Sequence, residues 1–190
     1  MKLVRLSLSA TTISGPLPTW LRKLPVIPFI NLSHNNLSGS LTNLPSVEAH
    51  NDFEYPVLFL QNNRFNESIP WLLCKRAYLY YLDLYRNMLI GKFPYSLKNW
   101  QRLRVLSLCS NWLIGAIPSS IGQFPSLTWL DLRDNNFSGE LPQEIWCLSQ
   151  LRILDLGVNA FHEKITNWIG EKLKSLRFSL SRKITSWEDS

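Results

Sequence analysis

The chain has 190 residues, of which 45% are hydrophobic and 18% are charged, so it can bury a sizeable core and is not intrinsically disordered. Its net charge of +6 comes from scattered Lys and Arg residues without a basic run, which does not fit a nucleic-acid-binding protein. The three cysteines form no Cys-x-x-Cys motif and the histidines have no metal spacing, which argues against a metal site.

A Leu-x-x-Leu-x-Leu-x-x-Asn motif recurs along the chain, with substitutions, and defines seven units. The units begin at Leu3, Ile27, Tyr55, Leu79, Leu103, Leu127 and Leu151. Successive starts are 24 residues apart, except for one interval of 28 between the second and third units. In each unit a Leu-x-Leu pair alternates with outward positions, which predicts one short strand with a buried face. Stacked units would place these strands in one parallel sheet on the concave side of a solenoid.

A polar residue recurs three positions after each Leu-x-Leu pair. In stacked repeats these residues are predicted to form a row of equivalent side chains, here called the ladder. Its amide members are Asn35, Asn63, Asn87, Asn111, Asn135 and Asn159, and the first unit has Thr11 instead. A buried amide there can bond backbone groups where the chain turns off the strand.

A Ser-Gly-x-Ile-Pro element follows in most units, as in Ser138-Gly139-Glu140-Leu141-Pro142. Gly permits a tight turn and Pro ends strand pairing, so the element predicts a bend onto the convex side. The predicted fold is an α/β repeat solenoid, a right-handed superhelix with a parallel concave sheet and an irregular or 3-10 convex side. Repeats are expected over residues 1–176. Residues 177–190 diverge, because after residue 176 the strand pattern has a shifted register and lacks its Asn.

These units resemble the plant-specific class of leucine-rich repeats. Their sequences are most similar to those in the ectodomains of plant receptor-like proteins, which lack a kinase domain. The segments that carry the resemblance are 97–103, 117–122 and 167–177. The resemblance implies a receptor truncated at both ends, because the family's capping modules with paired cysteines are absent. It also implies a parent protein at the plasma membrane with this region extracellular, although the chain itself shows no signal peptide and no membrane-spanning segment.

The same resemblance implies a binding function in immune or developmental signalling. The expected ligand is a peptide, protein or glycan, with partner receptor kinases acting through the parent protein. One alternative is a soluble inhibitor of cell-wall-degrading enzymes built on the same repeat. Another is a gene fragment without a function of its own.

Catalysis is not expected, nor is any cofactor. Asp83, Asp131 and Asp155 occupy the same position in their repeats. However, Leu-Asp-Leu is a common sequence in such repeats, and these side chains are expected on an exposed face of the strand. The three histidines lie at different positions of the repeat, so no pair is placed to hold a metal or serve a nucleophile.

Four Asn-x-Ser sequons are candidate glycosylation sites, at Asn36, Asn66, Asn136 and Asn31. The first three lie past the strand. Asn31 lies on the concave strand, where a glycan would obstruct binding.

Residues 47–54 form an acidic insertion in the longer unit, predicted to be a local loop or, alternatively, a loop that touches a ligand. For the binding surface itself, we expect outward strand positions rich in aromatic and basic residues. These are Phe59, Tyr81, Tyr85, Arg86, Trp129, Asp131 and Arg133.

Overall fold

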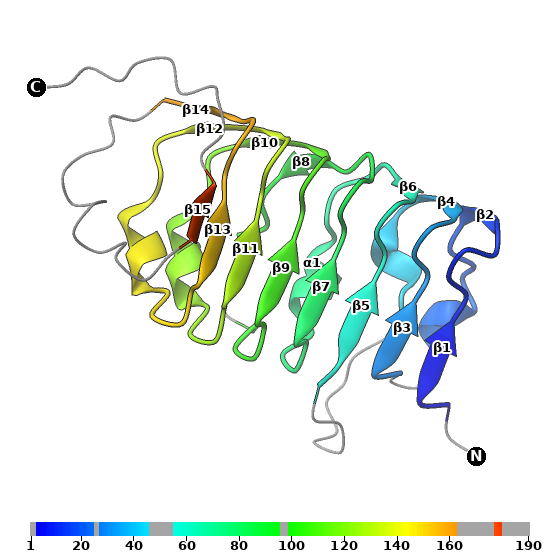
Figure 1. The fold of residues 1–190 in the computed structure, drawn as a ribbon. Helices are drawn as coiled ribbons and strands as arrows, with labels where there is room; N and C mark the ends of the chain where they lie inside the picture. The colour runs from blue at the N-terminus through cyan, green and yellow to red at the C-terminus, as the bar shows by residue number, and fades with distance from the viewer. Residues whose placement is uncertain (1–2, 25–26, 46–54, 96–98, 163–176, 180–190) are drawn as a thin grey trace, which may run out of the picture.

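Eight short parallel strands, in the order of the chain, form the main sheet of the computed structural model, which describes residues 3–24, 27–45, 55–95, 99–162 and 177–179 (Figure 1). The strands are β1 Arg5–Ser7, β3 Phe29–Asn31, β5 Val57–Phe59, β7 Tyr81–Asp83, β9 Val105–Ser107, β11 Trp129–Asp131, β13 Ile153–Asp155 and β15 Arg177–Ser179. Each strand pairs with that of the next repeat, so the chain advances by one strand per turn of the solenoid. The expected fold class is confirmed.

The pairing register follows the repeat. The central residues of consecutive strands lie opposite one another, as Leu82 does with Leu106 and Leu106 with Leu130. The register continues into β15, where Phe178 pairs with Leu154. The expected shift of register after residue 176 is therefore wrong, because the 24-residue spacing is kept. The division at residue 176 stays a prediction, and residues 180–190 lie outside the described part.

Two further parallel sheets, which the sequence analysis did not predict, run beside the main sheet along the top of Figure 1. One consists of β2 Ser14–Pro16, β4 Asn36–Gly39 and β6 Arg64–Phe65. The other consists of β8 Ile90–Lys92, β10 Trp112–Gly115, β12 Asn136–Gly139 and β14 Ala160–Phe161. The segment expected only to bend thus also pairs between repeats.

A missing glycine explains where these two sheets separate. Gly39 and Gly91 have φ angles of 73° and 85°, a conformation that other residues rarely adopt. The third unit has Glu67 at the equivalent position, and its strand β6 ends earlier, at Phe65.

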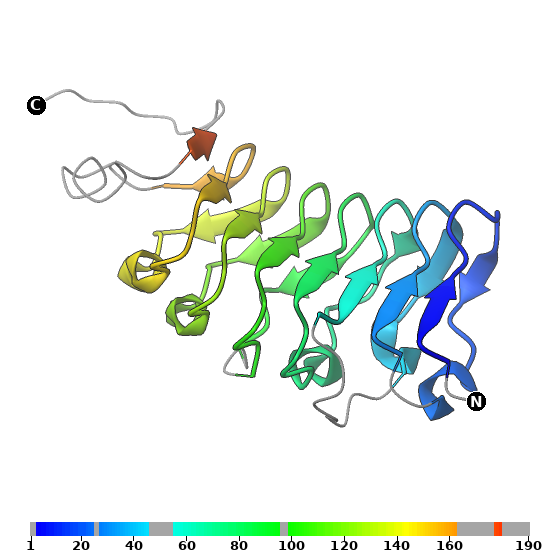
Figure 2. The same cartoon turned by 60° about the horizontal axis from the view of Figure 1, so that its bottom comes forward.

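Short helical turns line up along the convex side of the solenoid (Figure 2). They are η1 Leu21–Lys23, η2 Leu41–Asn43, α1 Trp71–Cys74, η3 Ser119–Gln123 and η4 Gln143–Cys147. Four of the five are 3-10 turns, as expected. In the described ranges, no helix is long and apolar enough to cross a membrane.

One continuous hydrophobic core fills the space between the strands and the helical turns. Its largest fully buried side chains include Trp100, Phe65, Phe93, Phe124 and Phe137. The indole of Trp100 donates a hydrogen bond of 3.1 Å to the carbonyl of Leu73, one repeat earlier, so even this polar atom is satisfied.

The six ladder asparagines are buried at the edge of this core. Each side-chain amide donates to carbonyls of its own repeat and of the repeat before, and its oxygen accepts a backbone N–H of the repeat before, as Asn111 does with Leu89 at 3.0 Å. In the first unit Thr11 stands in place of the asparagine, and its hydroxyl donates a hydrogen bond of 2.9 Å to the carbonyl of Leu8 in its own repeat. The acidic insertion at residues 47–54 lies outside the described ranges.

Candidate ligand-binding site on the concave sheet

Side-chain alternation along each strand divides the concave surface into columns that run from repeat to repeat. The residue before the central leucine or isoleucine of each strand faces outward. This first column reads Arg5, Phe29, Val57, Tyr81, Val105, Trp129 and Ile153. The residue after the central leucine forms a second column. It reads Ser7, Asn31, Phe59, Asp83, Ser107, Asp131 and Asp155. Aromatic and acidic residues therefore gather over the middle strands.

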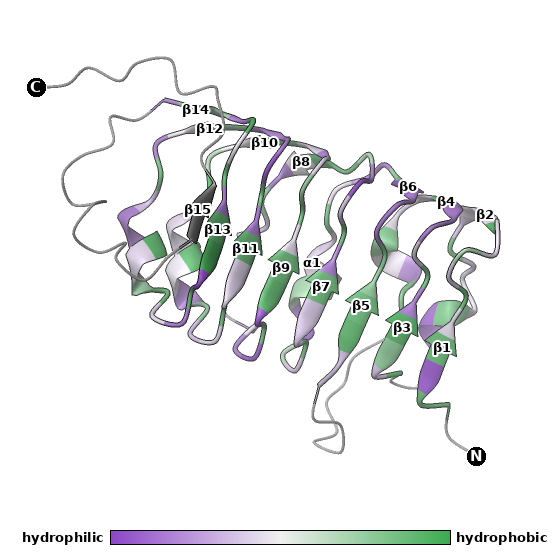
Figure 3. Ribbon diagram, viewed as in Figure 1, coloured by the Kyte–Doolittle hydropathy of each residue, from purple (hydrophilic) through white to green (hydrophobic). Residues whose placement is uncertain are grey.

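An aromatic ridge crosses β3, β5 and β7. The guanidinium carbon of Arg5 lies 4.2 Å from the ring centroid of Phe29, whose centroid is 5.8 Å from that of Phe59. The Phe59 centroid is in turn 4.9 Å from that of Tyr81. Figure 3 shows β5 as hydrophobic along its whole length, so this strand is apolar on its outer face as well as on its inner one. The ridge is a row of neighbouring aromatic rings on the outer face of the sheet, where a partner could bury apolar surface.

Beside the ridge lies a hollow of about 250 Å³, here called the concave hollow. It is lined by Tyr81, Asp83, Tyr85, Val105, Ser107, Trp129 and Asp131. Its walls are the large side chains of β7 and β11, while the smaller Val105 and Ser107 of β9 form its floor. The hollow exists because small residues on one strand lie between bulky residues on its two neighbours.

Two carboxyl groups line this hollow, that of Asp83 on β7 and that of Asp131 on β11. Burial raises the pKa of Asp83 and of Asp131 above the usual value for aspartate. The oxygen Oδ1 of Asp83 accepts the backbone N–H of Tyr85 at 2.9 Å, and that of Asp131 accepts the N–H of Arg133 at 3.1 Å. Both are half-buried, whereas the sequence analysis placed this column on an exposed face. Two partly desolvated carboxylates make the hollow suited to a cationic group.

Four of the seven residues expected on the binding surface line the concave hollow: Tyr81, Tyr85, Trp129 and Asp131. The others lie around it. Phe59 adjoins it through Tyr81, and Arg133 pairs with Asp155 at 3.8 Å.

Arg86 is exposed at the bend after β7, with a φ of 56°, and does not line the hollow. Sequence reasoning also missed lining residues of the site, namely Asp83, Val105 and Ser107. Asp83 could have been found, because it shares a column with Asp131.

The sequons differ in their surroundings. Asn36, Asn66 and Asn136 are exposed. Asn31 is half-buried on β3, and its Oδ1 accepts the hydroxyl of Ser33 at 2.7 Å.

The cysteines have no disulfide partner among the described residues. Cys74 and Cys109 are buried, and burial raises the pKa of both thiols to about 11. Cys147 is exposed. In the same part of the chain, no group of three or more His, Cys, Asp or Glu residues is placed to hold a metal ion.

Residues 77–137 and 101–161 match the family model described as Leucine rich repeat. Among known proteins, Receptor-like protein 7 of Arabidopsis thaliana is 35% identical over 112 residues, an alignment that covers 49% of this chain and 11% of the relative. The chain therefore spans about a tenth of the length of that relative.

Solved structures of plant receptors have the same fold. A TDR receptor matches with a TM-score of 0.79 and 26% identity, over 93% of this chain and 30% of the receptor chain. The Arabidopsis receptor kinase HAESA, solved in complex with the peptide hormone IDA and the co-receptor SERK1, matches with a TM-score of 0.67 and 28% identity. That match covers 87% of this chain and 31% of HAESA.

Proposed function

Because the chain carries leucine-rich repeats and is related to plant receptor-like proteins, we propose that it is a ligand-binding segment of a larger cell-surface receptor of that kind. In this proposal the segment is extracellular, the parent protein is anchored in the plasma membrane, and signalling in immunity or development passes to partner receptor kinases. The HAESA complex, which contains a peptide hormone and a co-receptor, supports a peptide ligand and a kinase partner.

The observation that carries the proposal is the concave hollow with its aromatic ridge. Trp129, which lines the hollow, is 43% exposed and is therefore accessible to a partner. Large aromatic side chains around a hollow supply much of the binding energy at protein interfaces.

The chemistry of the hollow favours an extended peptide with a basic side chain. The peptide would lie across β5, β7, β9 and β11, with its apolar residues on the ridge. Its Lys or Arg would enter the concave hollow, where a cation offsets the partial burial of Asp83 and Asp131.

A peptide selection tests this function. The purified chain is used to select binders from a phage-displayed random peptide library, and the affinity of the strongest peptide is measured by calorimetry. We expect enrichment of peptides with a Lys or Arg beside apolar residues. Trp129→Ala and Tyr81→Ala should each weaken binding at least about tenfold, with little change in melting temperature.

The matched control is Tyr95→Ala, which removes a side chain that is 67% exposed and lies outside the concave sheet. It should bind the selected peptide like the native chain. Normal binding by both concave variants, together with a loss in Tyr95→Ala, would show that the ligand uses another face.

A further inference from the structure

A buried arginine lies on the convex side, far from the concave hollow. Arg76 follows α1 and is only 6% exposed, and its Nη2 donates a hydrogen bond to the carbonyl of Pro45. Burial lowers the pKa of its guanidinium to about 9, so the group remains protonated at neutral pH. Within the described ranges the one ion pair joins Arg133 to Asp155, so Arg76 has no carboxylate partner there. A buried charge without a counter-ion is unfavourable.

Arg76 borders a cavity of about 600 Å³, here called the basic cavity, which opens between η1, η2 and α1. Four cationic side chains line it: Arg22, Lys23, Lys75 and Arg76. No acidic residue is among its lining residues in the described part of the chain. The rest of the wall is mostly apolar and comes from leucines of η2 and α1. Positive charge with an apolar wall is an arrangement that attracts and partly desolvates an anion.

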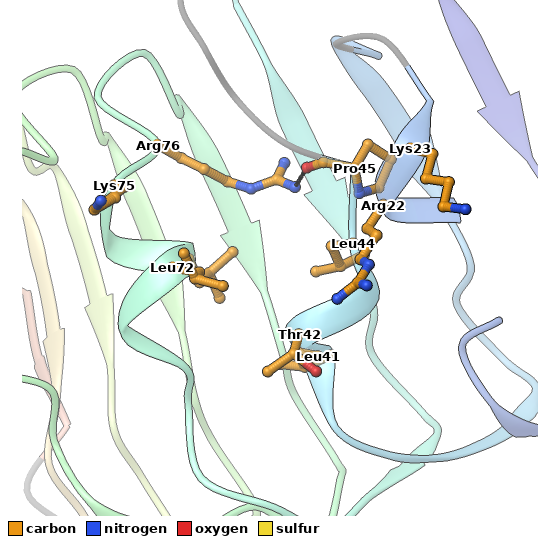
Figure 4. A pocket seen from close by; sticks show the side chains of 10 residues that line it. Arg22, Lys23, Leu41, Thr42, Leu44, Pro45, Leu72, Lys75 and Arg76 are labelled. Carbon is orange, nitrogen blue, oxygen red and sulfur yellow. Dashed lines mark hydrogen bonds between the residues drawn. The ribbon is translucent and has the colours of Figure 1, made fainter. Parts of the chain in front are cut away.

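The two arginines approach the cavity from different repeats. Figure 4 shows Arg76 reaching from the end of α1 towards Pro45, with Arg22 on the opposite side of the cavity, towards η2. The side-chain nitrogen of Lys75 lies 4.3 Å from the ring centroid of Trp71. The cavity lies next to the one repeat interval of 28 residues.

We propose that the basic cavity binds an oxyanion, a carboxylate, sulfate or phosphate group carried by a small ligand, between the guanidinium groups of Arg76 and Arg22. A guanidinium presents its N–H groups in a planar fork that matches two oxygens of such an anion. Among the described residues Arg76 donates a hydrogen bond to Pro45, and its other N–H groups have no acceptor there. The cavity is larger than one oxyanion needs, so the apolar remainder of the ligand would pack against the leucines. This site is separate from the concave hollow and does not depend on the proposed function.

Anion titration of the 190-residue chain tests the site. Sodium sulfate, sodium phosphate and sodium citrate are added at constant ionic strength, with sodium chloride as the reference, and binding is followed by calorimetry and by melting temperature. We expect one saturable site and a higher melting temperature with at least one of the three anions. The identity of the best anion distinguishes carboxylate from sulfate and phosphate chemistry.

Variants link the binding to the cavity. Arg22 is exposed, so Arg22→Gln should fold normally and bind the anion about tenfold more weakly. Arg76→Lys keeps a positive charge but loses the planar fork, and it should also bind more weakly. Lys92→Gln removes the same charge from exposed β8 and should bind like the native chain.

Three results would overturn the proposal. The first is equal stabilisation by chloride and by all three oxyanions, and the second is an equal loss in Arg22→Gln and Lys92→Gln. The third concerns the chain's own carboxylates at Glu48, Asp52 and Glu54, which follow Pro45 in the sequence. If anions bind only after these three are changed to amides, the cavity serves the chain's own acidic residues and not an external ligand.

Discussion

The side-chain amide of Asn135 donates a hydrogen bond of 3.0 Å to the carbonyl oxygen of Leu108, 27 residues earlier, and so joins two consecutive repeats. The same nitrogen donates to the carbonyl of Leu132 at 3.2 Å, and Oδ1 accepts the N–H of Leu113 at 3.1 Å. These bonds satisfy buried backbone groups that no strand partner reaches. The Asn135 side chain thus stabilises the interface between two neighbouring repeats, and the stability of a repeat protein depends on such interfaces.

Replacing this asparagine should therefore be costly. We expect Asn135→Ala to lower the free energy of unfolding by about 1–3 kcal/mol, because buried donors and acceptors are left without partners. Unfolding in urea, followed by circular dichroism, measures the change. The control is Asn136→Ala, at the exposed neighbouring position, which should have little effect. Equal losses at the two positions would contradict the structural role of the ladder.

Close packing between helical turns gives a second prediction, at Gly122 in η3. A Cβ atom there would lie 2.7 Å from the carbonyl oxygen of Glu144 and 2.8 Å from its Cβ, in the next repeat. We expect Gly122→Ala to lower the free energy of unfolding by about 1–3 kcal/mol, because backbone cannot move aside cheaply. Thermal unfolding checks it, with Ser119→Ala in the same turn as an exposed control. A variant as stable as the control would show that η3 and η4 are packed less tightly than described.

The third prediction concerns pH and Asp83. Burial raises the pKa of this carboxyl group in the folded chain, so the folded chain binds its proton more tightly than the unfolded chain does. The resulting stabilisation is complete below the unfolded pKa of about 3.9 and is lost as the pH rises through the folded pKa. Asp83→Asn, which keeps an oxygen to accept the N–H of Tyr85, should therefore stabilise the fold at about pH 7 and leave it unchanged at about pH 3.

Unfolding in urea at the two pH values measures this difference. Asp134→Asn, at an exposed position, controls for the loss of one negative charge. A gain that is the same at both pH values would mean that the effect does not come from ionisation of Asp83.

Glycosylation gives the fourth prediction. When the chain is secreted from eukaryotic cells, we expect glycans at Asn36, Asn66 and Asn136 but not at Asn31. The Asn31 sequon ends at Ser33, which is 2% exposed and whose hydroxyl is bonded to Asn31 itself. Peptide mass spectrometry before and after enzymatic removal of glycans measures the occupancy. Occupancy at Asn31 equal to that of the other three sites would contradict this expectation.

Much of the architecture follows from the sequence by itself. The 24-residue spacing and the alternation of Leu106 and Leu108 identify a strand and its buried face, because neighbouring side chains on a strand point to opposite sides. The recurrence of Asn at a fixed distance from that strand identifies the ladder, because a side-chain amide carries two N–H donors and an acceptor oxygen and so can bond several backbone groups at a turn. These inferences need only local geometry and the fact that units of equal length stack in register.

The tertiary structure decided the features that depend on the shape of one repeat relative to the next. The two further sheets pair segments of neighbouring repeats, several of which contain a glycine in the left-handed conformation, such as Gly39, and composition alone does not reveal this pairing. The concave hollow lies where Ser107 comes between larger residues of adjacent strands, and the half-buried Asp83 lines it. Arg76 likewise reaches the carbonyl of Pro45, 31 residues earlier. A period in sequence fixes which residues face inward, but burial and contact at the surface depend on the side chains that neighbouring repeats bring beside them.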